Sequence, residues 1–256
     1  MIHATAIIDP SAIIADNVEI GAYTVIGANV TIGEGCVIGP HVGIKGTTSI
    51  GKNNKIYQFS SVGEDPQDKK YAGENTFLEI GDNNIIREFT TINRGTVQDG
   101  GLTKIGNNNL FMAYTHVAHD CQMANDIIMA NASSIAGHVE VGSHVILGGF
   151  TIVHQFCHLG ERSFAAMGSS ITKDVPPYVM IGGTPTKPHG INSVGLERAG
   201  FSTEAIRSIK SAYKLLYKSK LSFEVAKSQL EIAATDCSEL RLMSDFLKAS
   251  SRGIIR

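Results

Sequence analysis

Residues 25–44 read "VIGANVTIGEGCVIGPHVGI", in which Ile26, Ile32, Ile38 and Ile44 stand at a constant spacing of six. This period matches neither the 3.6-residue period of an amphipathic helix nor the alternation of a half-buried strand. Glycine follows several of the aliphatic residues and lets the backbone turn tightly. The stretch therefore predicts a chain that coils.

The same register covers most of the sequence. It runs through residues 2–62, resumes over 80–92 and continues over 105–171. Three hexads, or 18 residues, make one turn of a triangular coil whose aliphatic side chains point inward and whose short strands stack in parallel. At about 4.8 Å per coil, roughly nine coils give a prism about 40 Å long. The prediction is a mainly β fold, a parallel β-helix of hexapeptide repeats. Its left hand is inferred from resemblance to proteins with this repeat, because spacing alone leaves the hand open.

Two polar, glycine-bearing insertions interrupt the period near residues 63–79 and 93–104. Long loops on a rigid scaffold often carry function. The hexads are expected to end with the stretch "KDVPPYVMIGGTPTKPHG" (173–190), because its paired Pro176 and Pro177 cannot continue a ladder. The predicted β-helix domain therefore spans residues 1–185.

Residues 186–256 have a helical pattern and are predicted to form a small C-terminal α-helical domain. Ser202, Ser222 and Ser238 each precede a helical pattern and are expected to be N-caps.

Composition narrows the classes of function. The formal net charge of −2 and the pI near 6.5 argue against a general nucleic-acid binder. The four cysteines form no CxxC pair, the N-terminus lacks a signal-peptide pattern, and the longest apolar run, residues 145–153, is too short to span a bilayer. A soluble cytoplasmic protein without a transmembrane segment is expected.

The chemistry-bearing stretch is "THVAHDC", residues 115–121. Since residues 18 apart stack on successive coils, Asp120 lies below His138 and His119 lies below Gly137. His116 and His154 belong to the same series of coils. Four histidines are therefore expected to share one patch. A single histidine is usually a solvated or structural side chain, but four together favour a functional site.

A general base is one interpretation of this patch. Adjacent residues of a strand point to opposite sides, so contact between Asp120 and His119 requires a corner or a bulge. If the chain turns there, Asp120 can orient His119 as a general base, and the N–H of Gly137 can stabilise an oxyanion. Cys121 has no separate base, so direct attack by an acceptor hydroxyl is the simplest acyl-transfer chemistry.

Two alternatives remain open. A zinc site could use His116, His119, His138 or His154, as in hexapeptide-repeat carbonic anhydrases. A non-catalytic β-helical scaffold would explain the repeat but not the histidines.

Seven motifs occur together in order along the whole chain. They are "DKKYAGE" (68–74), "NRGTVQDGGLTKIG" (93–106), "HVAHDC" (116–121), "IAGHVEVG" (135–142), "VHQFC" (153–157), "DVPPYV" (174–179) and the ending "RGIIR" (252–256). The sequence resembles the UDP-N-acetylglucosamine O-acyltransferases, which catalyse the first step of lipid A synthesis. The resemblance implies a cytoplasmic homotrimer that transfers a 3-hydroxyacyl group from acyl carrier protein to the glucosamine 3-hydroxyl, without a metal or other cofactor.

The resemblance also assigns roles to individual residues. His119 is the implied general base, Asp120 its partner and Gly137 the oxyanion donor. The implied substrate-binding residues are His116, His138, His154 and Gln155 along the cleft, Asp68 and Lys70 at the sugar nucleotide, and Asn192 and Arg198 at its phosphates or nucleoside. The sequence departs from the family pattern at Asn93, Val194 and Ala199, where His, Glu and a second Arg are common. Whether the acceptor is UDP-N-acetylglucosamine or its 3-amino analogue is left open.

In the family that the sequence resembles, the position of Met167 faces the far end of the acyl groove. Enzymes of that family that use long acyl chains have a small residue at this position. The rise from Val117 to Ala165 is roughly 13 Å, which accommodates about ten carbons. The resemblance therefore implies a preference for 3-hydroxydecanoyl donors.

Residues 198–220 contain six basic side chains, those of Arg198, Arg207, Lys210, Lys214, Lys218 and Lys220, against the single acidic Glu204. A basic helix face suits an acidic partner such as acyl carrier protein, although a solvated face is an equally good interpretation of the charges alone.

Overall fold

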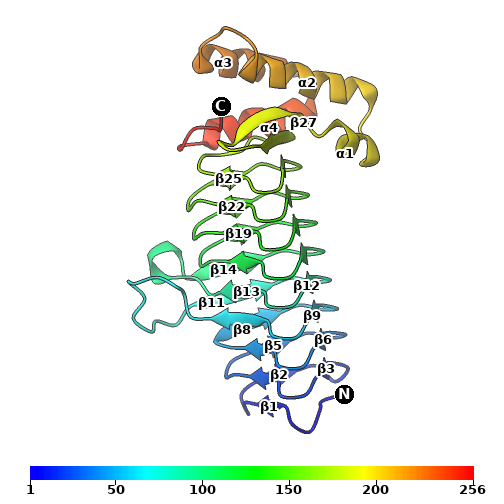
Figure 1. Ribbon diagram of the computed structural model, residues 1–256, viewed down its shortest axis with the longest axis vertical. Coiled ribbons are helices and arrows are strands. Elements are labelled where there is room, and N and C mark those ends of the chain that lie inside the picture. The colour runs from blue at the N-terminus through cyan, green and yellow to red at the C-terminus, as the bar shows by residue number, and fades with distance from the viewer.

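The computed structural model describes all residues, 1–256, as a long prism of stacked coils with helices at one end (Figure 1). Three parallel sheets form the sides of the prism, with nine, eight and ten strands. The predicted mainly β fold, a left-handed parallel β-helix with a small C-terminal helical part, is confirmed. None of the helices has the length and hydrophobicity that a membrane-spanning segment needs.

The strands are short, and every third strand along the chain joins the same sheet. The nine-stranded sheet contains β1 (Ile7–Ile8), β4 (Val25–Ile26), β7 (Gly43–Ile44), β10 (Ser61–Glu64), β13 (Thr91–Asn93), β16 (His116–Val117), β19 (Ser134–Ile135), β22 (Ile152–Val153) and β25 (Ser170–Ile171). The eight-stranded sheet contains β2 (Ile13–Ile14), β5 (Thr31–Ile32), β8 (Thr47–Ile50), β11 (Phe77–Ile80), β14 (Leu102–Ile105), β17 (Gln122–Met123), β20 (Glu140–Val141) and β23 (His158–Leu159). The ten-stranded sheet contains β3 (Glu19–Ile20), β6 (Val37–Ile38), β9 (Lys55–Ile56), β12 (Ile85–Ile86), β15 (Leu110–Phe111), β18 (Ile128–Met129), β21 (Ile146–Leu147), β24 (Phe164–Ala165), β26 (Val179–Gly182) and β27 (Lys187–Ile191).

The hexad register places the core. Val117 pairs with Ile135 and Ile135 with Val153, so residues 18 apart stack as the sequence predicts. The inward residues of the hexads are buried from Ile20 to Ile171. At the N-terminal end Ile2 is 48% exposed, because no earlier coil covers it. Burial of this continuous aliphatic column is the main stabilising term of the prism.

Both insertions leave the prism at the same edge. One connects β10 to β11 and the other connects β13 to β14, and both pass from the nine-stranded to the eight-stranded sheet. We call this edge the loop edge; its insertions project to the left in Figure 1. On the next four coils it is formed by residues 118–121, 136–139, 154–157 and 172–175.

The end of the coil corrects one expectation. The ladder continues beyond Pro176 and Pro177, because β26 pairs in parallel with β24 on the ten-stranded sheet. The two prolines lie between Val175, which bridges to Leu159, and β26, so they occupy a corner where the ladder needs no N–H. Only the antiparallel pairing of β27 with β26 ends the coil.

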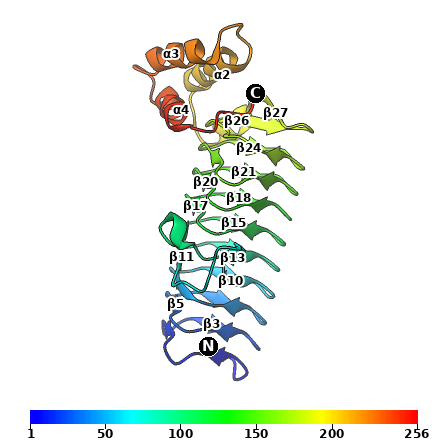
Figure 2. The same cartoon turned by 90° about the vertical axis from the view of Figure 1, so that its left-hand side faces the viewer.

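Four helices follow: α1 (Ser193–Arg198), α2 (Thr203–Tyr217), α3 (Phe223–Ala233) and α4 (Ser238–Ala249), packed beyond the last coils (Figure 2). Ser202 and Ser222 cap α2 and α3 through their hydroxyls, as predicted. The prediction for Ser238 is wrong by one residue: Cys237 is the N-cap and makes no side-chain cap bond, while Ser238 begins α4.

Candidate active site

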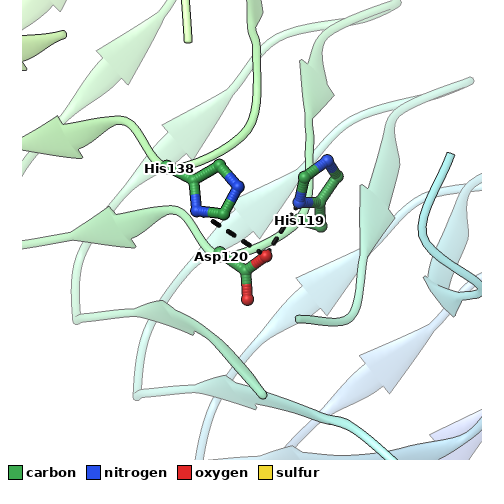
Figure 3. A group of neighbouring side chains, drawn as sticks. All are labelled: His119, Asp120 and His138. Carbon is green, nitrogen blue, oxygen red and sulfur yellow. Dashed lines mark hydrogen bonds and ion pairs between the residues drawn. The ribbon is translucent and has the colours of Figure 1, made fainter. Parts of the chain in front are cut away.

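The contact between His119 and Asp120 depends on the loop edge. Asp120 has a φ of 59°, in the left-handed region that Asp and Asn tolerate better than most residues. This turn brings two adjacent side chains together, with His119 Nδ1 2.8 Å from Asp120 Oδ2 (Figure 3). The corner that this contact requires is therefore present.

Asp120 is 2% exposed and is held by the second insertion. Its carboxylate accepts hydrogen bonds from the Thr96 N–H at 2.7 Å and the Thr96 hydroxyl at 2.6 Å. Burial alone would raise the pKa of Asp120, but the hydrogen bonds from His119 and Thr96 outweigh it and lower that pKa below its usual value. Asp120 is thus a charged acceptor in a fixed orientation.

This acceptor fixes the state of His119. A carboxylate only accepts, so His119 Nδ1 carries the proton and Nε2 is left as a base. Gly137 lies against the same ring: a Cβ there would lie 2.5 Å from His119 Cε1, so only glycine fits without movement. The Gly137 N–H donates no hydrogen bond within the protein. A base and a free N–H donor therefore lie side by side, as acyl transfer requires.

A second histidine lies above the first. His138 meets the His119 ring edge-on, with centroids 5.0 Å apart, and stacks on Phe156 at 4.4 Å. Its Nδ1 is 2.7 Å from Asp99 Oδ2 and 3.8 Å from Asp120 Oδ2. Sequence reasoning missed both Asp99 and Thr96, because a loop of irregular structure has no register from which its contacts can be computed. The only signal was the length of the second insertion.

The other two histidines are placed differently. His116 is on β16, with Nδ1 2.7 Å from the Thr91 hydroxyl, and burial lowers its pKa. The positive charge of a protonated His119 adds to this lowering, so the two rings are electrostatically coupled. His154 lies two coils beyond His119 and contacts Arg252, with Gln155 beside it. His119 and His138 therefore contact Asp120, His116 lies near His119, and His154 faces Arg252 further along the same edge.

The remaining predicted site residues fall into two groups. Asp68 and Lys70 are in the first insertion, on the loop edge two coils before His119, where Asp68 accepts a hydrogen bond from the Lys70 N–H at 2.9 Å. Asn192 and Met167 lie elsewhere. Asn192 caps α1, which ends at Arg198, and lines a cavity of about 210 Å³ beside the ten-stranded sheet. Met167 is 76% exposed on the edge between the ten-stranded and nine-stranded sheets. Within one chain Asp68 and Lys70 share the edge of His119, whereas Asn192, Arg198 and Met167 do not.

The zinc alternative needs three free ligands. His119, Asp120 and His138 offer atoms within 4.8 Å of one another. Asp120 already accepts hydrogen bonds from His119 and Thr96, and His116 and His154 face Thr91 and Arg252. The three-histidine set of a carbonic anhydrase is not assembled in the chain.

Cys121 is not available as a nucleophile. Burial raises the pKa of its thiol to about 12, and its Sγ donates to the Ala136 carbonyl. The arrangement therefore favours direct attack by a substrate hydroxyl activated by His119.

Known proteins match the chain over its whole length. Residues 174–255 match the second domain of the UDP-N-acetylglucosamine O-acyltransferase family, and residues 1–34 match the bacterial transferase hexapeptide repeat. Acyl-[acyl-carrier-protein]--UDP-N-acetylglucosamine O-acyltransferase of Stutzerimonas stutzeri is 51% identical over 256 residues, covering 100% of this chain and 99% of the relative. The enzyme of that name from Xanthomonas oryzae is 54% identical over 257 residues, with coverage of 100% and 98%.

Solved structures give the same result. The UDP-N-acetylglucosamine O-acyltransferase of Moraxella catarrhalis is 48% identical, with a TM-score of 0.98 and coverage of 100% and 99%. The UDP-N-acetylglucosamine acyltransferase of Francisella novicida is 42% identical, with a TM-score of 0.98 and coverage of 100% and 94%. Identity at this level over the full length is decisive, and the chain belongs to the UDP-N-acetylglucosamine O-acyltransferase family.

Proposed function

We propose that this protein transfers a 3-hydroxyacyl group from acyl carrier protein to the 3-hydroxyl of UDP-N-acetylglucosamine, the first step of lipid A synthesis. The observation that carries the proposal is the His119–Asp120 pair with Gly137, whose N–H is unbonded, packed against the same ring. The names of the relatives supply the two substrates.

The proposed reaction has one general base. His119 Nε2 takes the proton of the sugar hydroxyl as its oxygen attacks the carbonyl carbon of the acyl thioester. The Gly137 N–H donates to the resulting oxyanion, and Asp120 stabilises the imidazolium. Collapse breaks the carbon–sulfur bond, and His119 returns the proton to the thiol of the carrier. Each proton and electron pair is accounted for without a cofactor or a metal.

The substrates are proposed to bind along the loop edge. Asp68 and Lys70 in the first insertion, with His116 and His138 near the base and Gln155 two coils beyond it, would line the acceptor cleft. His154 lies further along the same edge. Asn192, Arg198 and Met167 are remote from His119 in one chain, so we propose a homotrimer in which a neighbouring subunit supplies them.

Two finer features belong to the proposal. The donor is inferred to be 3-hydroxydecanoyl carrier protein, because Met167 is a large residue at a position that is small where longer chains are used. The protein is inferred to act in the cytoplasm, where acyl carrier protein is available.

Replacement of His119 tests the function. His119→Ala should leave the protein folded and lower turnover by about 10² to 10⁴, the usual worth of a general base. Turnover is measured with 3-hydroxydecanoyl carrier protein and UDP-N-acetylglucosamine, and folding by thermal melting. His3→Ala is the matched control, since the side chain of His3 is exposed on the first coil and forms hydrogen bonds only with Thr5. Near-normal turnover in His119→Ala would contradict the role of His119.

The same assay separates the zinc alternative. Purified wild-type protein should keep its acyltransferase turnover after treatment with a chelator, and metal analysis should find less than one zinc per site. Loss of turnover that zinc restores would favour a metal-dependent reaction instead.

A further inference from the structure

The loop edge continues beyond the proposed catalytic residues toward the helical domain. His119, Gly137, Gln155 and Lys173 occupy equivalent positions on four successive coils, since each follows the last by 18 residues. Lys173 is exposed at the end of this column. A ligand that extends along the prism from His119 would therefore pass Gln155 and reach an ammonium group.

The C-terminal tail is fixed at this same place. Asp174 on the last coil donates its N–H to the Gly253 carbonyl and accepts from the Ile255 N–H, both at 3.0 Å. Its carboxylate accepts from the Ser250 hydroxyl at 2.6 Å and from the His158 N–H at 2.9 Å. Ile254 and Ile255 are 4% and 5% exposed. Burial and hydrogen bonding hold the tail on the prism, independently of its arginines.

Arg252 projects from this anchored tail onto the loop edge. Its Nε donates to the Thr172 carbonyl at 3.0 Å, and its terminal nitrogen lies 2.9 Å from His154 Nδ1. A guanidinium only donates, so His154 Nδ1 accepts and its Nε2 carries the proton. The Gln155 carbonyl, 3.1 Å from the same Nδ1, is then a close neighbour and not a hydrogen-bond partner. Arg252 and His154 are thus neighbouring hydrogen-bond donors on the loop edge.

No acidic group balances these donors. Arg252 and Lys173 form no ion pair, and the carboxylate of Asp174 is occupied by Ser250 and His158. Arg252, the imidazole N–H of His154 and the exposed Lys173 therefore lie on the same edge, two to three coils, or roughly 10 to 14 Å, from His119. Guanidinium and ammonium groups placed in this way suit a phosphate oxygen.

We propose that Arg252, with Lys173, binds a phosphate group of a substrate. The inference rests on the proposed function, which offers two sources: the diphosphate of the nucleotide sugar and the phosphate of the carrier's phosphopantetheine arm. Arg252 is then a binding residue supplied by the last turn of the chain, and the tail anchored by Asp174 has a function beyond closing the fold.

Arg252→Gln removes the charge, and Arg256→Gln is the matched control in the same tail. Arg256 donates to the Leu216 carbonyl at 2.9 Å and lies over the Phe223 ring, away from the loop edge. Lys173→Gln is the second variant, because Lys173 makes no hydrogen bond that the fold would lose. For each protein we would measure the KM of each substrate with the other saturating, the affinity for uridine diphosphate by calorimetry, and the melting temperature.

Arg252→Gln should raise one KM about ten- to a hundredfold with little change in kcat, as expected for loss of a hydrogen bond to a charged group. Lys173→Gln should raise the same KM about two- to fivefold, as expected for an exposed charge. A higher acceptor KM with weaker uridine diphosphate binding identifies the nucleotide phosphates. A higher donor KM with unchanged uridine diphosphate binding identifies the phosphopantetheine phosphate.

The phosphate site would be overturned if both variants had the same two KM values and the same uridine diphosphate affinity as Arg256→Gln. It would also be overturned if the melting temperature fell while neither KM changed. Wild-type protein that binds uridine diphosphate through Arg252 but transfers no acyl group would overturn the proposed function and leave the phosphate site standing.

Discussion

Asp120 links the second insertion to the proposed base. Its carboxylate accepts hydrogen bonds from both His119 and Thr96. Without the negative charge, the proton of His119 should no longer be held on Nδ1. We expect Asp120→Asn to lower turnover by about a hundredfold or more with a smaller change in KM. Steady-state kinetics measure this, and an unchanged kcat would contradict the orienting role.

The same residue makes stability depend on pH. The folded-state pKa of Asp120 is lowered, so its contribution is present above its unfolded pKa of about 3.9 and is lost as pH falls through the folded pKa. The difference in unfolding free energy between wild type and Asp120→Asn should therefore be largest near neutral pH and shrink below about pH 4. Urea denaturation across that range is the measurement, and a difference independent of pH would show that the charge is not stabilising.

Gly137 tests the geometry around the base. Gly137→Ala introduces a Cβ that would lie 2.5 Å from His119 Cε1, so the ring must move away from the oxyanion donor. Turnover should fall by about 10² or more, because the displaced His119 no longer reaches the proton of the sugar hydroxyl. The coil should remain folded. Gly43→Ala is the control, since nothing lies within 4 Å of a Cβ at that position. Equal turnover in the two variants would argue against close packing of His119 on Gly137.

Among the elements, the two insertions act as one unit. Arg94, only 7% exposed, donates to the Gly63 carbonyl, pairs with Asp65 and reaches the Tyr71 hydroxyl at 3.0 Å. Asn93 donates to the Asp65 carbonyl at 2.8 Å. The start of the second insertion therefore holds the first, which carries Asp68 and Lys70. Asn93, which stands where the family commonly has His, is therefore one of the residues that join the two insertions.

Helix α2 carries the predicted basic face. Arg207, Lys210, Lys214 and Lys218 are exposed, and none forms an ion pair within the chain. We expect Lys210→Glu combined with Lys214→Glu to raise the KM for acyl carrier protein, with the difference from wild type shrinking as salt is added, because exposed charges are screened beyond roughly 10 Å at 0.1 M salt.

Lys55→Glu provides a charge-reversal control for this experiment, with half the change in net charge, on the exposed surface of β9 far from α2. If the double variant has the KM of wild type, the basic face is only solvated. If Lys55→Glu has the same effect, net charge and not docking is responsible.

Elements with a strict period could be predicted, and those without one could not. The inward register from Ile20 to Ile171 and the stacking of Asp120 below His138 follow from residue spacing alone. The contacts of Thr96 and Asp99 do not, because their insertion follows no repeat. The corner at Pro176 could not be predicted either, because proline disrupts a ladder only within a strand and this residue lies between strands.

At the scale of the whole molecule, the isolated chain exposes an apolar column. On the edge between the ten-stranded and nine-stranded sheets, five rings stack with centroids 4.8 to 5.3 Å apart: Tyr23, His41, Phe59, Phe89 and Tyr114. Tyr23 and Tyr114 are 60% and 61% exposed. Contiguous exposed aromatic surface of this kind is uncommon on monomers and typical of interfaces. The edge is thus a suitable contact surface for the proposed homotrimer.

Met167 lies on that edge, one side of the prism away from the loop edge of His119. The rise of roughly 13 Å between Val117 and Ala165 therefore does not describe a groove within one chain, because the two edges face different directions. Met167 can limit acyl length only if a neighbouring subunit brings it to His119. Chain-length selection is then a property of the assembly.

Met167→Gly should open the end of such a groove and shift the ratio of kcat/KM values toward 3-hydroxymyristoyl over 3-hydroxydecanoyl donors by about tenfold, because extra methylenes no longer displace packed atoms. Mixed trimers locate the effect. In trimers assembled from His119→Ala and Met167→Gly chains, active sites need His119 from a Met167→Gly chain. If the neighbour supplies residue 167, sites beside a His119→Ala chain retain the methionine and its short-chain preference. If both residues come from one chain, every active site in the mixture shows the long-chain preference, and Met167 does not act across the interface.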